Sequence, residues 1–218
     1  MNLEEMRNEV ENLVDDSSFD PDTIDNYLNQ MLTYSAGLIN LPSLKRISTV
    51  VTIEDQAYTS ISGLDGGFSG ILRRVKNAEG EEPRIYSNLE LLLDDYPTID
   101  EEGDVEAVAL EGSTLWYQKI PSSAETLLLL YFRNPSPLIG GDDEPGDIPE
   151  HVHRKLLVHG AAYMIFDQIE DGIEGEKVNT VHNFHQSLNE ENKHSGIVKL
   201  REWIGRTSKH HISSVWSC

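Results

Sequence analysis

The stretch IPEHVHRKLLVHGAAYMIFDQIED, residues 148–171, decides the fold class, because it combines a helical hydrophobic period with small residues. The residues of one helix face recur at spacings of three and four: Val152, Leu156, Gly160, Tyr163 and a position near Phe166. Gly160 and the two alanines that follow it, Ala161 and Ala162, are small enough to let a neighbouring helix come close. The stretch therefore predicts a packed helix that begins near Pro149.

The same stretch carries three histidines, which raises the question of a metal site. A catalytic zinc site usually takes histidines at positions i and i+4 of one helix. His151 and His153 are two positions apart and so point to different sides, and His159 lies about 120° around the helix from His153. His182 and His185 form an i, i+3 pair, but no carboxylate or cysteine at a fixed spacing completes a shell. We expect core or solvated histidines, with no metal and no other cofactor.

Two further helices are predicted before residue 43. In the first, which ends near Asp15, one stripe is apolar: Leu3, Met6, Val10, Leu13 and Val14. In the second, Asp20 is the expected N-cap and Pro21 the first helical residue. Its expected buried face is Ile24, Tyr27, Leu28, Met31, Ser35 and Leu38, and Asn40 and Pro42 end it.

Between residues 44 and 134 the sequence is rich in β-branched and aromatic residues, separated by Gly, Pro, Asn and acidic turns. This predicts a small antiparallel sheet, with one short helix capped by Ser87. A last helix is expected over 176–205, which the sequence HSG at 194–196 could break.

The predicted fold is therefore α+β: a helical bundle with two amino-terminal and two carboxyl-terminal helices. Its domains are a helical core (1–43 and 135–206), an inserted β-rich subdomain (44–134) and an extended carboxyl-terminal tail (207–218).

The charge of the chain restricts its function. A net charge of -21, from 17 Lys and Arg against 38 Asp and Glu, argues against a protein that reads nucleic-acid sequence. Glu4 and Glu5 stand where a signal peptide would be basic, and the longest apolar run, 127–132, is too short to cross a bilayer, so no membrane role is expected. The lone Cys218 and the absence of a G-x-S-x-G motif leave no enzyme signature.

Two blocks of the sequence resemble bacteriophage adaptor proteins, the head-to-tail connectors that bind below the portal. In the block at 19–52, the residues that match this family's helix motif are Ile24, Asp25, Leu28 and Asn29. In the block at 125–166, the matching helix positions are Pro149, Glu150, His153, Leu156, Leu157, Gly160, Ala161 and Ala162. Residues 55–112, between the blocks, match only in strand texture.

The resemblance implies a structural virion protein at the head-tail junction, in a twelve-membered ring around a DNA channel. Its partners would be the portal protein, a tail or nozzle component and further copies of itself, and genomic DNA would pass through without specific binding. The acidic residues expected to face the channel or the next tail component are Asp94, Asp95, Asp100, Glu101, Glu102 and Asp104. A solvated outer surface is an equally open interpretation of them.

The carboxyl end has the opposite charge balance, since Lys193, Lys199, Arg201 and Arg206 outnumber the acids around them. Similar adaptors grip the portal with a carboxyl-terminal arm, and that role is expected here for Lys209, His210, His211, Ile212, Val215 and Trp216. The alternative is a frayed terminus.

Two other functions stay open from the sequence. One is a small metal-dependent hydrolase that uses the histidine-rich helices. The other is a binding module whose acidity mimics DNA.

Overall fold

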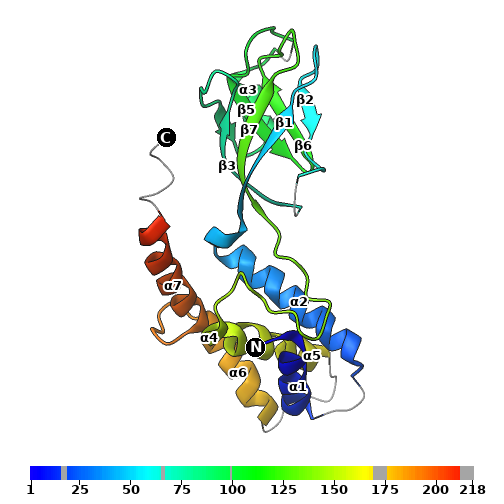
Figure 1. Ribbon diagram of the computed structural model, residues 1–218, viewed down its shortest axis with the longest axis vertical. Coiled ribbons are helices and arrows are strands. Elements are labelled where there is room, and N and C mark those ends of the chain that lie inside the picture. The colour runs from blue at the N-terminus through cyan, green and yellow to red at the C-terminus, as the bar shows by residue number, and fades with distance from the viewer. Residues whose placement is uncertain (16–18, 65–66, 99, 169–175, 212–218) are drawn as a thin grey trace. The chain divides into compact units, whose positions relative to one another are not determined.

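The computed structural model describes the chain except residues 16–18, 65–66, 99, 169–175 and 212–218, and it leaves out the side chains of 168, 176–177 and 207–211. The fold is mixed α+β and forms two compact units (Figure 1). The helical unit comprises Met1–Ser43 and Pro135–Cys218, and the β unit is Leu44–Asn134.

The first two helices of the helical unit follow the local signals in the sequence. α1 (Leu3–Val14) begins with a capping box, in which Asn2 Oδ1 accepts from the Glu5 amide at 2.9 Å and the Glu5 carboxylate accepts from the Asn2 amide at 3.1 Å. α2 (Pro21–Leu38) is capped by Asp20, as predicted. The buried residues of α2 are Ile24, Leu28, Met31, Leu32, Ser35 and Ala36.

Two residues expected on the buried face of α2 lie elsewhere. Tyr27 is only partly buried and Leu38 is exposed, whereas Leu32 and Ala36 are buried in their place. An α-helix turns once in 3.6 residues, so the buried face of a helix of several turns does not keep to fixed spacings of three and four residues. A prediction from those spacings therefore includes some positions that lie outside the buried face.

The helix predicted from Pro149 has an irregular centre. It consists of α4 (Glu150–His153), a π-helical turn (Arg154–Val158) and α5 (His159–Gln168). A π turn adds one residue to the helical repeat. Three consecutive residues, Leu156, Leu157 and Val158, are all buried, because four other helices of the unit contact this turn and cover it on several sides.

The helix expected over 176–205 is two helices, α6 (Glu176–Leu188) and α7 (Gly196–His211). The HSG sequence does break the helix. Ser195 Oγ accepts from the Val198 amide at 3.2 Å and caps α7, and a Cβ at Gly196 would lie 2.9 Å from Leu156 Cδ2. α7 passes through Gly205 and continues to His211, so the tail expected from 207 begins as helix; one exposed glycine costs only about 1 kcal/mol and does not end a helix.

The helices of this unit pack around α5. α5 contacts α1, α2 and α6, and α1 also contacts α2. Gly160 makes the closest approach, because a Cβ at this position would lie 2.5 Å from Met31 Cε. A side chain larger than glycine would therefore displace the Met31 side chain at the α2–α5 contact.

After a 3-10 turn, Pro42–Leu44, the β unit contains seven named strands: β1 (Lys45–Val51), β2 (Tyr58–Ser60), β3 (Phe68–Lys76), β4 (Arg84–Tyr86), β5 (Ala107–Glu111), β6 (Thr114–Gln118) and β7 (Thr126–Arg133). They form two sheets, with strand orders β1-β7-β3 and β2-β6-β5-β4 (Figure 1).

The single antiparallel sheet predicted for residues 44–134 is therefore wrong in two respects. There are two sheets, and β4 pairs with β5 in parallel. β4 follows Pro83 and has only three residues, too few to show an alternating pattern. Parallel neighbours need a crossover, and the β4–β5 connection contains α3 (Leu89–Asp95).

The N-cap of α3 is Asn88, one residue after the predicted Ser87. Asn88 Oδ1 accepts from the Leu91 amide at 2.9 Å. The prediction was wrong by one position because both residue types cap helices, and only the backbone path decides which one reaches the free amides.

The two sheets enclose the core of the β unit. Val50, Val75 and Leu129 of the three-stranded sheet pack with Val108 and Tyr117 of the four-stranded sheet. α3 covers the other face of the four-stranded sheet, where Leu92 packs with Ala107 and Ala109. Alternate residues of β5 thus serve two different clusters.

Candidate interaction surfaces

The polar residues of the first adaptor-like motif tie α2 to its neighbours. The Asp25 carboxylate accepts two hydrogen bonds from Arg7 of α1, from Nε at 2.8 Å and from Nη2 at 2.6 Å. Asn29 Nδ2 donates to the Leu138 carbonyl at 2.9 Å, and Asn29 Oδ1 accepts from the Leu138 amide at 2.7 Å. The motif therefore fixes both α1 and the segment after β7 against α2.

The second motif is also structural. His153 is buried, with 3 % of its surface exposed, and its ring nitrogen Nε2 lies 2.7 Å from the Ile148 carbonyl. Leu156, Ala161 and Ala162 are fully buried. These positions build the core of the helical unit and its contact with α2.

The remaining histidines are dispersed. His151, His182, His185 and His194 are exposed, and His159 is partly buried. Burial lowers the pKa of His153 and of His159, and the nearby Arg154 lowers the His159 pKa further. Among the residues that the structure describes, no three His, Cys, Asp or Glu side chains are grouped closely enough to hold a metal ion.

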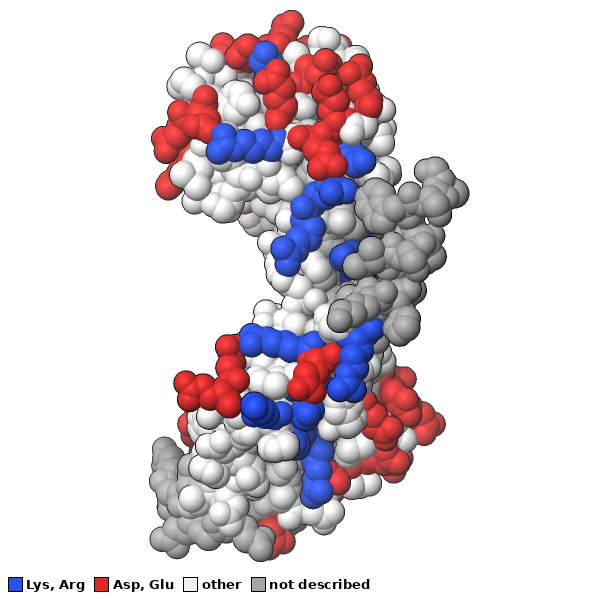
Figure 2. All heavy atoms as spheres, turned by 90° about the vertical axis from the view of Figure 1, so that its left-hand side faces the viewer, with Lys and Arg blue, Asp and Glu red and all other residues white. Residues whose placement is uncertain are grey.

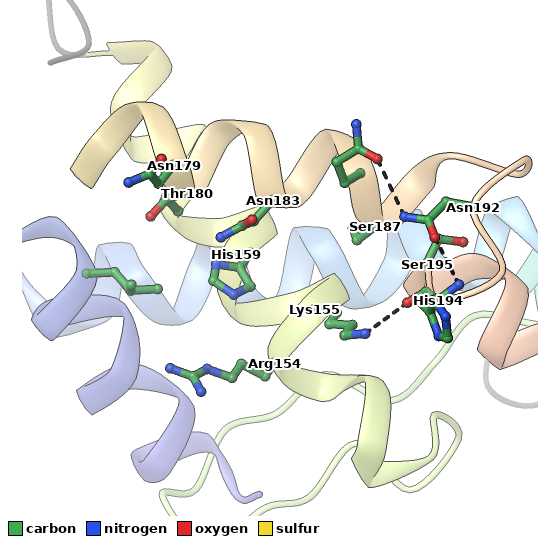
Figure 3. A pocket seen from close by; sticks show the side chains of 12 residues that line it. Arg154, Lys155, His159, Asn179, Thr180, Asn183, Ser187, Asn192, His194 and Ser195 are labelled. Carbon is green, nitrogen blue, oxygen red and sulfur yellow. Dashed lines mark hydrogen bonds between the residues drawn. The ribbon is translucent and has the colours of Figure 1, made fainter. Parts of the chain in front are cut away.

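A polar groove of about 650 Å³ lies in the helical unit (Figure 3). One wall is the irregular helix, which contributes Arg154, Lys155 and His159. The other is α6 and the connection to α7, where the lining side chains are mostly amides and hydroxyls: Asn179, Thr180, Asn183, Gln186, Ser187, Asn192 and Ser195.

One hydrogen bond joins the two walls of the groove, since Lys155 Nζ donates to the His194 carbonyl at 2.9 Å (Figure 3). Within the α6–α7 connection, the His194 amide donates to Asn192 Oδ1 at 3.0 Å. Arg154 Nε lies 3.3 Å from a Glu9 carboxylate oxygen of α1. Since its described lining contains no Asp or Glu, the groove offers hydrogen-bond donors to an acceptor such as a carboxylate, in a chain that is otherwise acidic.

The acidic residues singled out from the sequence all belong to the β unit, but they do not form one free surface. Asp95 at the end of α3 accepts from Arg84 Nη1 at 2.9 Å and from the Tyr86 hydroxyl. Glu101 lies 3.2 Å from Lys119 Nζ. Residues 85–118 include no Lys or Arg. Arg84 and Lys119, the cations on either side of this stretch, therefore pair with acidic residues inside it.

The other four acidic residues of the set, Asp94, Asp100, Glu102 and Asp104, are exposed. In the space-filling view, Asp and Glu crowd the top of the β unit, while Lys and Arg lie mainly lower on that unit (Figure 2). On the face that this view shows, most of the acids of the β unit therefore lie apart from most of its cations.

The predicted portal-docking arm falls largely outside the described residues. The backbone of Lys209, His210 and His211 completes α7, but their side chains are not described, and Ile212, Val215 and Trp216 lie outside the described part of the chain.

None of the described helices combines the length and the apolar character that crossing a membrane requires.

Comparison with known proteins identifies one family. The model of the SU10 adaptor protein family matches residues 1–192, which include both motifs, the whole β unit and the helical unit as far as α6. No curated protein matches the chain.

Proposed function

Because this chain belongs to the SU10 adaptor protein family of bacteriophage head-to-tail adaptors, we propose that its copies form a ring of twelve between portal and tail. The observation that carries this proposal is the family match over residues 1–192. The motif residues support it, since Asp25, Asn29 and His153 each hold the helical unit together through a specific contact. The role is structural and requires no catalysis.

The charge of the chain suits a passage for DNA. Twelve copies at -21 each would carry roughly 250 negative charges before counterions bind. Phosphates are repelled by such a wall, so a genome would pass through without specific binding. Asp100, Glu102 and Asp104, the exposed acids beyond α3, would face the channel or the next tail component.

The carboxyl-terminal residues would attach the ring to the portal. Lys209, His210, His211, Ile212, Val215 and Trp216 combine positive charge with apolar side chains, as a docking segment would. Deletion of residues 209–218 should abolish binding to purified portal while leaving the fold of the rest intact. Unchanged portal binding by the truncated chain would contradict the arm.

Electron microscopy of purified portal mixed with the full chain tests the main proposal. We expect one additional layer with twelvefold symmetry on the tail-facing side of the portal. The matched control is the same mixture with Asp25→Ala/Asn29→Ala, which disrupts the helical unit and should reduce the layer. A portal that gains no layer from the intact chain would contradict the adaptor ring.

A further inference from the structure

The β unit has two outer faces, and they differ in whether a helix covers them. α3 covers much of the outer face of the four-stranded sheet. The outer face of the three-stranded sheet, which we call the open face, consists of the β1, β7 and β3 side chains that point away from the core. On it, Ile47 is 64 %, Val51 54 % and Leu128 39 % exposed. Three exposed large apolar side chains are thus gathered on one face of this sheet, and exposed apolar residues that lie together are a feature of interaction sites.

These residues are neighbours across the strands. Ile47 of β1 pairs with Leu130 of β7, which pairs in turn with Arg74 of β3. One row further along, Thr49 pairs with Leu128, and Leu128 with Lys76. The open face is therefore mainly apolar over β1 and β7, apart from Lys45 at the start of β1, and basic over β3.

Its charges are mainly positive. Arg73 lies over the Phe132 ring, 5.5 Å from the ring centroid, and Lys45 is the strand partner of Phe132. Arg74 and Lys76 both approach the Glu82 carboxylate, at 3.4 and 3.8 Å. Lys45, Arg73, Arg74 and Lys76 thus all lie on or beside this face, and Glu82 accepts contacts from two of them.

The opposite side of the β unit, which we call the α3 face, has the complementary character. Leu91 of α3 is 46 % exposed, and the acidic Glu90 and Asp94 beside it are exposed as well. Tyr58 of β2 is also 46 % exposed and packs on Trp116, with ring centroids 5.0 Å apart. This face is therefore apolar, with the exposed acids Glu90 and Asp94 at its border and Arg84 paired with Asp95 beside them.

We propose that the open face of one copy binds the α3 face of the next copy. Apolar residues would meet apolar residues, and Lys45 and Arg73 would meet Glu90 and Asp94. Complementary charges favour this pairing, whereas two open faces or two α3 faces would bring like charges together. The inference rests on the proposed ring and names the surfaces that close it.

The position of the two faces explains why the contact would produce a ring. They are on opposite sides of a two-sheet sandwich, so the contact is head to tail and each copy keeps one free face after binding another. Such a contact continues until the rotation between neighbours closes a ring. A contact between two like faces would stop at a dimer.

Charge reversal tests the contact directly. Variant A, Lys45→Glu/Arg73→Glu, has two acidic faces, and variant B, Glu90→Lys/Asp94→Lys, has two basic faces. Each alone should form about tenfold fewer rings than the wild type on purified portal, counted by electron microscopy, because like charges then meet at every contact. Glu11→Lys/Glu144→Lys, which changes two exposed acids of the helical unit, is the matched control and should leave ring formation unchanged.

Mixing the variants provides the decisive measurement. In an equal mixture of A and B every contact between unlike copies has opposite charges, so rings that alternate A and B should form again, and native mass spectrometry should find equal numbers of each. The single chain that carries all four substitutions should also form rings, which excludes misfolding as the cause of the loss.

The outcomes separate this inference from the proposed function. If wild-type chain forms no ring, the proposed function fails. If wild-type rings form and A and B form them equally well, or if neither the mixture nor the fourfold variant restores them, the named contact is wrong although the ring stands.

Discussion

The helical unit and the β unit are assembled in opposite ways. The helical unit joins residues 1–43 with residues after 134, and its polar contacts bridge that separation, as when Asn29 binds Leu138. The β unit is one continuous segment, and its core forms between strands of that segment alone. The two recognisable motifs lie mainly in the helical unit. The motif residues Asp25 and Asn29 therefore make contacts between separate stretches of the helical unit, whereas the core of the β unit forms between strands of one continuous segment.

The strongest test of this difference is a cavity in the β unit. Leu129→Ala removes a side chain that is 1 % exposed, and it should destabilise the β unit by about 2–5 kcal/mol. Hydrogen exchange measured by mass spectrometry should show lost protection over residues 44–134 only. The neighbouring Leu128→Ala, on the open face of the same strand, is the control and should change little. Equal loss of protection in both units would mean that the two do not unfold independently.

Overpacking of the α2–α5 contact tests the helical unit in the same way. Gly160→Val places atoms where Met31 now lies, and it should cost about 2–3 kcal/mol in that unit. Denaturant unfolding followed by helical circular dichroism measures the effect. At Gly37 of α2 a Cβ would meet nothing within 4 Å, so Gly37→Ala should be neutral or stabilising. If Gly160→Val were as harmless as Gly37→Ala, the close approach of α2 and α5 would be refuted.

Removing the bridge between the two halves of the helical unit should have a smaller effect. Asn29→Ala deletes both hydrogen bonds to Leu138, at an expected cost of about 1–2 kcal/mol. Faster exchange of the Leu138 amide would show that the bridge is lost. Asn26→Ala, at an exposed position of the same helix, should leave that amide protected. Protection unchanged in Asn29→Ala would remove the structural explanation for this motif position.

The smallest expected effect is a difference between the two units in how their stability changes at low pH. Burial lowers the pKa of His153 and His159 below the ordinary value of 6.5, so the unfolded chain binds protons more readily and the helical unit loses stability as pH falls below about 6.5. In the β unit burial raises the pKa of Glu125 above 4.5. The partly buried, charged carboxylate therefore destabilises the folded β unit at neutral pH, and protonation of Glu125 in acid removes this destabilisation.

Unfolding free energies of each unit, measured between about pH 7 and pH 4.5, should therefore diverge. His153→Gln should reduce the slope for the helical unit, because it removes one of the two titrating groups. A slope of the same sign in both units would contradict the assignment of these groups.

The local features of the fold were readable from the sequence. The Asp20 cap and the break at 194–196 each depend on hydrogen bonds within a few residues, whereas the Ser87 cap was predicted one residue before the actual Asn88. Irregular elements escaped prediction. β4 was too short to show a period, and the π turn interrupts the period that identifies a helix.

The candidate surfaces show the same difference between features that the sequence predicts and features that it does not. Sequence alone determined the charge of the chain, the cap of its second helix, its strand-rich centre and its resemblance to adaptors, because composition, period and capping act over short distances. Only the tertiary structure decided that Arg84 and Lys119 return to neutralise part of the acidic stretch, that α3 covers one sheet and that the other keeps an open, partly basic face. Those outcomes depend on which distant segments meet when the chain folds, and pairing over such distances leaves no periodic signal in the sequence.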